Sequence, residues 1–216
     1  MKRTIFLFFI LVIALTRNVA LGDDEDGQRV PAGAFAFHFL ARISFPASMP
    51  PVLVGYLAFI EGVPGPFFDG TPGEATAFFT LRVTSAPPPI FLSPGSNVAV
   101  NLLPPGATFD VFFDETPDQD WADPDSFSDG EVIATFEESW FAGTRIGEPD
   151  GSGVSYNLFS SDLIFSKRFR FNGQKIDFKK LIRNGVTITN FGSSTPVSFD
   201  PFTLGFTGSA VAIGNN

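Results

Sequence analysis

Carboxylates crowd one segment of the chain, and their spacing suggests metal binding. Thirteen acidic residues fall between Asp110 and Asp150, where Arg145 is the only basic residue. Ca²⁺ takes roughly six to eight oxygen ligands, so the loop 114–131 is a candidate calcium site, although its spacing is not that of an EF-hand. The alternative is a solvated acidic loop that adds solubility. The candidate ligands are Asp118, Asp120, Asp123, Asp125 and Asp129.

A further carboxylate, Glu138, occupies an unusual place in a predicted strand. Alternation along residues 131–141 puts it on a face with Val132, Ala134, Phe136 and Trp140. A carboxyl group desolvated beside Trp140 would have a raised pKa and could act as a general acid, as in glycoside hydrolases. The alternative is a residue near the strand end that reaches solvent or an arginine, because structural ion pairs also perturb pKa values.

Basic residues gather late in the chain, around a predicted hairpin. Arg168, Arg170 and Lys175 are candidate ligands for an anion such as a polysaccharide, a lipid headgroup or a carboxylate. The alternative is that they are the outward residues of a hairpin whose phenylalanines face the core.

Several other chemistries lack the residues they need. There is no Cys and one His, His38, so thiol catalysis and the usual zinc sites are excluded. No G-x-S-x-G elbow accompanies His38, and no phosphate-binding glycine loop occurs. The formal net charge of −9 makes nucleic acid an improbable partner, since phosphate binding needs a positive face.

The elements that position these residues are strands. Alternation of period two recurs along the chain, which predicts about ten strands that each bury one face. Clusters rich in Pro and Gly, such as 64–66, 71–73, 87–89 and 104–106, supply turns between them. The predicted strands are 34–43, 52–60, 74–84, 97–103, 107–113, 131–141, 154–171, 174–178, 186–191 and 202–213.

This pattern predicts an all-β fold: a single antiparallel β-barrel, about the size found in calycins and allene oxide cyclases, or alternatively a β-sandwich. Asn172-Gly173 is the preferred pair for a two-residue hairpin turn. One short helix is predicted near 177–184, capped by Asp177 and ended at Asn184-Gly185. The chain contains 28 Phe, whose rings bury apolar area without a polar group to satisfy.

The N-terminus predicts export. Lys2 and Arg3 precede an apolar run of eleven residues, 5–15, and small residues follow at 20–22, as in a secretory signal peptide. The expected organisation is a signal peptide at 1–22, an acidic flexible N-terminus at 23–30 and one all-β domain at 31–216. Removing Lys2, Arg3 and Arg17 leaves a mature charge of 11 − 23 = −12. The expected location is secreted or periplasmic, with no membrane span in the mature chain.

These features favour an exported, non-catalytic β-domain that binds a small apolar or amphipathic ligand in an interior lined with phenylalanine. Its expected lining includes Glu138, Trp140, Phe136 and Phe79. One alternative is an extracellular structural or adhesive module that binds a macromolecule, with Ca²⁺ at 114–131 as the one cofactor considered. The other is a metal-free isomerase, cyclase or hydrolase that uses an interior carboxylate, for which Glu138 is the candidate catalytic residue.

Overall fold

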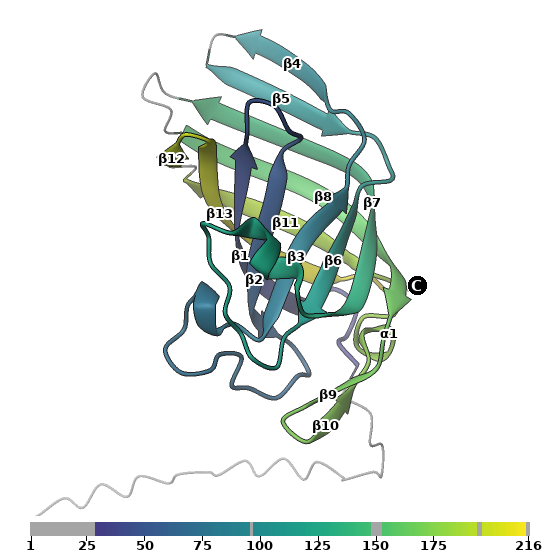
Figure 1. Cartoon of the computed structure of the whole chain (residues 1–216). Helices are drawn as coiled ribbons and strands as arrows, with labels where there is room; N and C mark the ends of the chain where they lie inside the picture. The colour runs from purple at the N-terminus through teal and green to yellow at the C-terminus, as the bar shows by residue number, and fades with distance from the viewer. Residues whose placement is uncertain (1–28, 96, 148–152, 194–195, 215–216) are drawn as a thin grey trace, which may run out of the picture.

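The computed structural model describes residues 29–95, 97–147, 153–193 and 196–214, and within them almost every element is a strand (Figure 1). The exceptions are two 3₁₀ turns, η1 (Glu74–Thr76) and η2 (Pro124–Ser128), and one helix, α1 (Phe178–Leu181). The strands are β1 (Phe35–Phe45), β2 (Val52–Ile60), β3 (Phe79–Ser85), β4 (Ile90–Gly95), β5 (Val98–Leu103), β6 (Thr108–Phe113), β7 (Glu131–Gly147), β8 (Gly153–Ser166), β9 (Phe169–Phe171), β10 (Gln174–Ile176), β11 (Val186–Ser193), β12 (Pro196–Phe199) and β13 (Phe202–Ala212).

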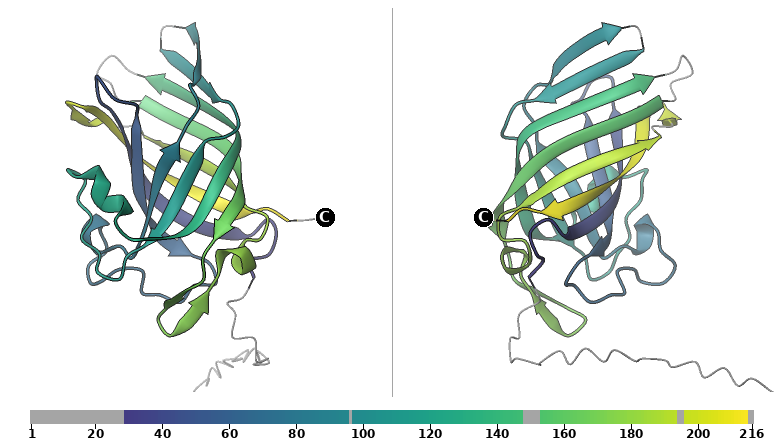
Figure 2. Two further views of the ribbon diagram at one scale, coloured as in Figure 1. Left: turned by 45° about the vertical axis from the view of Figure 1, so that its right-hand side comes forward. Right: turned by 180° about the vertical axis from the view of Figure 1, so that it is seen from behind.

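Eight antiparallel strands close into a barrel. They follow the order β7-β6-β3-β2-β1-β13-β11-β8, and the pairing of β8 with β7 completes the circuit. The structure is therefore the predicted barrel and not the alternative sandwich. Strand β7 is long enough to pair with β6 over its first half and with β5 over its second, so the β4–β5 hairpin extends the wall beyond the barrel (Figure 2).

The strand predictions were correct for most of the barrel but missed two strands. Strands β4 and β12 have no clear alternation; β4 follows Pro87-Pro88-Pro89, and β12 begins with Pro196. The predicted strand 154–171 is divided into β8 and β9, and the segment 74–84 begins with η1 before β3 starts at Phe79.

Phenylalanine rings fill the interior at one end of the barrel. Phe37, Phe79 and Phe136 are completely buried, and the ring of Phe136 stacks on that of Phe109 with centroids 4.9 Å apart. The β9–β10 hairpin closes this end, which we call the hairpin end, because the Phe171 ring packs edge-on against Phe79 at 4.9 Å.

The hairpin forms as predicted, and the helix begins after Asp177 as predicted but ends at Leu181, before Asn184-Gly185. Asn172 and Gly173 have φ angles of 47° and 80°, the left-handed conformations that a two-residue type I′ turn requires. Asp177 caps α1 by accepting a hydrogen bond from the Lys179 backbone N–H at 3.0 Å. Gly185 follows with a φ of 87°.

One outer face of the wall is apolar and uncovered. It spans β4, β5, β7 and β8, which are seen face-on from behind in Figure 2. The paired residues of these strands that point outward carry no charge. They are Ile90, Leu92, Val98, Val100, Leu102, Ala142, Thr144, Ile146, Val154, Tyr156 and Leu158. We call these residues the outer apolar face.

The predicted signal peptide at 1–22 lies outside the described residues, as does most of the predicted acidic N-terminus at 23–30. Among the residues that are described, no helix has the length and hydropathy of a membrane span.

We expect the buried rings to dominate stability. Replacing Phe79 with Ala should lower the free energy of unfolding by about 3–5 kcal/mol, because the interior cannot collapse around the cavity. Replacing Phe91, which is 70% exposed, with Ala should change it by less than about 0.5 kcal/mol. Urea denaturation of both variants measures this, and equal losses would show that the barrel interior is not the stabilising core.

Candidate functional site

Glu138 and Ser161 face each other across β7 and β8, on the interior side of the wall. The two residues are cross-strand partners, so their side chains emerge from the same face of the sheet. That face is the inner one, because Phe136, two residues before Glu138, packs in the core. Glu138 is 7% exposed and Ser161 is fully buried.

Both groups lack a hydrogen-bonding partner within the described chain. The Ser161 hydroxyl is buried without one, and no described side chain hydrogen-bonds or pairs with the Glu138 carboxyl. The backbone of Glu138 is satisfied, since its N–H donates to the Ala107 carbonyl at 2.7 Å and its carbonyl accepts from the Gly106 N–H at 3.1 Å. The pair thus offers two unused polar groups inside an apolar barrel, where buried polar groups are normally paired.

Burial raises the pKa of Glu138 from 4.5 to about 7. Loss of hydration disfavours the charged form, and no neighbouring positive charge or hydrogen bond compensates for that loss. Around neutral pH a substantial fraction of Glu138 is therefore the neutral acid, which can donate a hydrogen bond to a carbonyl oxygen.

Trp140 does not share the face of Glu138, so the predicted alternation is wrong beyond residue 138. The register shifts between Glu138 and Phe141, where β7 contains one more residue than β8. This β-bulge at Ser139 and Trp140 turns both side chains outward, and Trp140 is 57% exposed. After the bulge, Phe141 takes the inner position and its ring contacts Phe159.

The other two predicted ligand-lining residues, Phe79 and Phe136, are packed among other rings toward the hairpin end. Toward the opposite end, which we call the distal end, several side chains packed on the core are half-buried. They include Leu53, Val83, Phe159 and Phe206. Glu138 and Ser161 thus lie between the ring-filled hairpin end and these half-buried residues.

The His38 imidazole hydrogen-bonds to side chains of strand β13. His38 Nδ1 lies 3.0 Å from the Ser209 hydroxyl and Nε2 lies 2.9 Å from the Thr207 hydroxyl, so strand β13 uses both ring nitrogens. His38 therefore does not contact Ser161, whose hydroxyl has no partner in the described chain.

The acidic loop folds against the outer side of β2 and β3. Phe127 is fully buried there, and its carbonyl accepts a hydrogen bond from the Thr80 hydroxyl at 2.7 Å. Five predicted calcium ligands surround one open hollow of about 410 Å³: Asp118, Asp120, Asp123, Asp125 and Asp129.

Three of those five carboxylates already have local roles. Asp125 pairs with Arg82 at 2.7 Å, Asp120 accepts from the Ala122 backbone N–H at 2.8 Å, and Asp123 accepts from the Asp125 backbone N–H at 3.2 Å. Asp118 and Asp129 converge with Asp114, which lies outside the predicted ligand set and whose carboxylate likewise accepts from a backbone N–H, that of Thr116 at 2.9 Å. Because Asp114 directly follows β6, only the folded barrel places it beside Asp129.

The predicted anion ligands lie on the hairpin and its approach. Arg170 and Lys175 are cross-strand partners, and Arg168 lies 3.9 Å from the Asp177 carboxylate. Phe169 and Phe171 face the core, as the alternative interpretation of this segment required.

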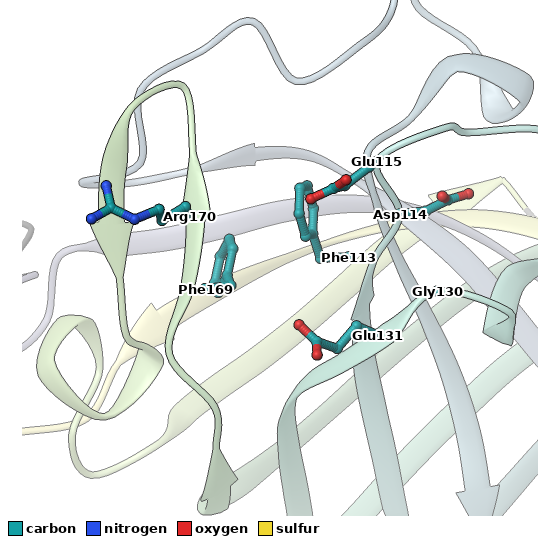
Figure 3. A pocket seen from close by; sticks show the side chains of 7 residues that line it. All are labelled: Phe113, Asp114, Glu115, Gly130, Glu131, Phe169 and Arg170. Atoms are coloured by element: carbon teal, nitrogen blue, oxygen red, sulfur yellow. The ribbon is translucent and has the colours of Figure 1, made fainter.

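A second open hollow of about 400 Å³ lies beside this hairpin (Figure 3). Its lining combines Arg170 with three acidic residues, Asp114, Glu115 and Glu131, over Phe113 and Phe169. The Arg170 guanidinium points away from the carboxylates, and Glu131 pairs with Lys167. Because acidic residues outnumber the one arginine in this lining, the hollow does not favour the binding of an anion.

Comparison with known proteins identifies no relative: no family model, curated protein or solved structure matches the chain. The site must therefore be interpreted from its own chemistry.

The buried acid makes stability depend on pH. Between pH 4.5 and 7 the folded protein keeps a proton on Glu138 that the unfolded chain loses, so the free energy of unfolding falls as pH rises. The loss totals about 3 kcal/mol and is complete above pH 7. We expect Glu138→Gln to match the parent at pH 4.5 and to exceed it by up to about 3 kcal/mol at pH 8.

Denaturant titrations at several pH values measure this difference. Glu137→Gln removes the same charge from the exposed neighbouring position and should show no such divergence. Parallel curves for the parent and Glu138→Gln would contradict the burial of an unpaired acid.

Proposed function

We propose that this protein is an exported, non-catalytic β-barrel that binds a small amphipathic molecule inside its distal half. The observation that carries the proposal is that the buried, unpaired Ser161 hydroxyl lies opposite the buried Glu138 carboxyl on the inner wall. Leaving a buried hydroxyl and a buried carboxyl unpaired costs stability. A ligand that hydrogen-bonds to both offsets that cost when it is bound.

The chemistry of the pair defines the ligand class. Neutral Glu138 and Ser161 each present an O–H donor, which suits a carbonyl or another acceptor oxygen. The half-buried side chains beyond them are apolar, so the rest of the ligand should be apolar as well. The ligand we infer is an uncharged molecule with an apolar body and one acceptor group, such as a ketone.

Binding is favoured over catalysis by what accompanies the pair. General acid catalysis needs a second group that accepts or donates the balancing proton, and His38 is occupied on β13. Ser161 has no base beside it that would activate its hydroxyl, since no described side chain hydrogen-bonds to it.

A fluorescent ketone of this class, prodan, tests the proposal. We expect saturable one-to-one binding with blue-shifted emission, and an affinity that falls as pH rises through about 7 because the ionised Glu138 no longer donates. Glu138→Gln should bind without this pH dependence, since an amide donates at every pH. Ser161→Ala should weaken binding several-fold.

Trp140→Ala is the matched control, because Trp140 lies on the outside of the same strand. If Trp140→Ala abolished the blue shift while Ser161→Ala had no effect, the probe would be on the outer wall and the proposal would be overturned.

A second function is favoured by the outer apolar face. We propose that two copies of the chain associate through this face, as a structural module of the outer surface or periplasm. Monomers seldom leave a large contiguous apolar surface exposed, and Ile146 and Leu92 of this face are each at least 50% exposed. In a chain of net charge −9, a two-fold contact between uncharged faces keeps the acidic residues of the two copies apart.

Sedimentation velocity tests this association. We expect a dimer for the parent protein and a monomer for Leu158→Glu, which places a charge on the face. Thr84→Glu adds the same charge at an exposed position on β3 and should remain dimeric. A monomeric parent at the highest soluble concentration would refute this proposal without affecting the interior site.

A further inference from the structure

Three carboxylates from separate parts of the acidic segment converge on one point. Asp114 follows β6, Asp118 lies in the loop, and Asp129 follows η2. One oxygen from each lies within 4.8 Å of the others. None of the three forms an ion pair with a basic side chain in the described part of the chain.

A buried amide supplies an independent sign of a missing ligand. Gln119 is 1% exposed, and its Nε2 donates to the Asp114 carboxylate at 3.0 Å. Its Oε1 is buried without a hydrogen-bond partner. Both atoms are bonded to one carbon, so the orphan oxygen belongs to the same amide that contacts Asp114. A carboxylate cannot satisfy this oxygen, because both are acceptors, whereas a cation can bind both kinds of oxygen.

The charge distribution supports the same conclusion. Three carboxylate oxygens that lie within 4.8 Å of one another repel, and a cation between them makes this arrangement favourable.

The framework of the cluster is rigid without the cation. Arg82 holds the preceding turn by contacting Asp125 at 2.7 Å and the Ser128 hydroxyl at 2.8 Å. Gly130 lies so close to β6 that a Cβ there would come within 2.7 Å of the Phe113 carbonyl oxygen. This close approach keeps Asp129 beside Asp114, the residue that follows Phe113.

We propose that Asp114, Asp118, Asp129 and the Gln119 side-chain oxygen bind one Ca²⁺ ion. All four ligands are oxygens, which selects a hard cation. Asp118 and Asp129 are exposed, so water completes the coordination shell on the solvent side. Ca²⁺ accepts such an irregular, partly hydrated site more readily than Mg²⁺, which demands near-ideal octahedral geometry. The site is separate from the interior pair and does not depend on it.

Isothermal titration and thermal unfolding of the full chain with CaCl₂ test the proposal. We expect one site with a Kd of about 10⁻⁴ to 10⁻³ M, as in extracellular calcium modules, and a melting temperature that rises with CaCl₂ but little with equal MgCl₂. Asp118→Asn and Asp129→Asn should each weaken binding at least about tenfold. Gln119→Met, which keeps the length but removes the oxygen, should do the same.

Asp120→Asn is the matched control, because Asp120 lines the same hollow as Asp118 and Asp129 and an Asn there still accepts from the Ala122 N–H. It should bind Ca²⁺ within about twofold of the parent, because it is not a ligand. If Asp120→Asn weakened Ca²⁺ binding as much as Asp118→Asn, the acidic loop would attract Ca²⁺ only through its overall charge and not at one site. If MgCl₂ raised the melting temperature as much as CaCl₂, the site would not select Ca²⁺. Either result, or no calcium response at all, overturns the proposal.

Discussion

The pairing of β7 with β8 is the constraint on which the rest of the structure depends, since it joins the two ends of an eight-stranded sheet. A closed barrel of this size has an interior just wide enough for its own side chains or for one small ligand. At the hairpin end the inward residues fill that space with apolar rings. Phenylalanine fills space without a polar atom to satisfy, which gives a physical reason for its abundance over Tyr and Trp.

The closed barrel has parts that differ in how their side chains are packed and exposed. At the hairpin end, Phe169 and Phe171 plug the barrel and fix the core. Toward the distal end the packing loosens, and there the wall carries Glu138 and Ser161. The acidic segment lies outside, held by Phe127 against β2 and β3. The interior pair thus lies on the inner side of β7 and β8, whereas the acidic segment lies outside the barrel against β2 and β3.

Local patterns in the sequence predicted most of the fold. Alternation identified the barrel strands, Asn172-Gly173 identified the hairpin, and Asp177 identified the helix cap, because each depends on neighbouring residues. Burial of Glu138 followed from the same alternation. Strands β4 and β12 escaped prediction because long-range pairing, and not their own pattern, makes them strands.

The rest of the candidate sites could not be derived from spacing. Ser161 becomes a partner of Glu138 only when β8 meets β7, and Asp114 and Gln119 join Asp129 only when β6 is in place. The two-residue spacing of Glu138 and Trp140 misled the prediction, since a bulge changes the phase of a strand without a clear sequence signal.

That bulge has a consequence for how the chain can change over evolution. After the bulge at Ser139 and Trp140, each side chain of β7 points inward or outward according to the one extra residue that the bulge contains. Deleting a single codon there would exchange the two faces of the strand, so that Ala142 and Thr144 would turn inward and Phe141 and Arg145 outward. Substitution of the exposed Trp140 leaves this direction intact. The gene should therefore tolerate many replacements at position 140 but no change in the length of the segment around it.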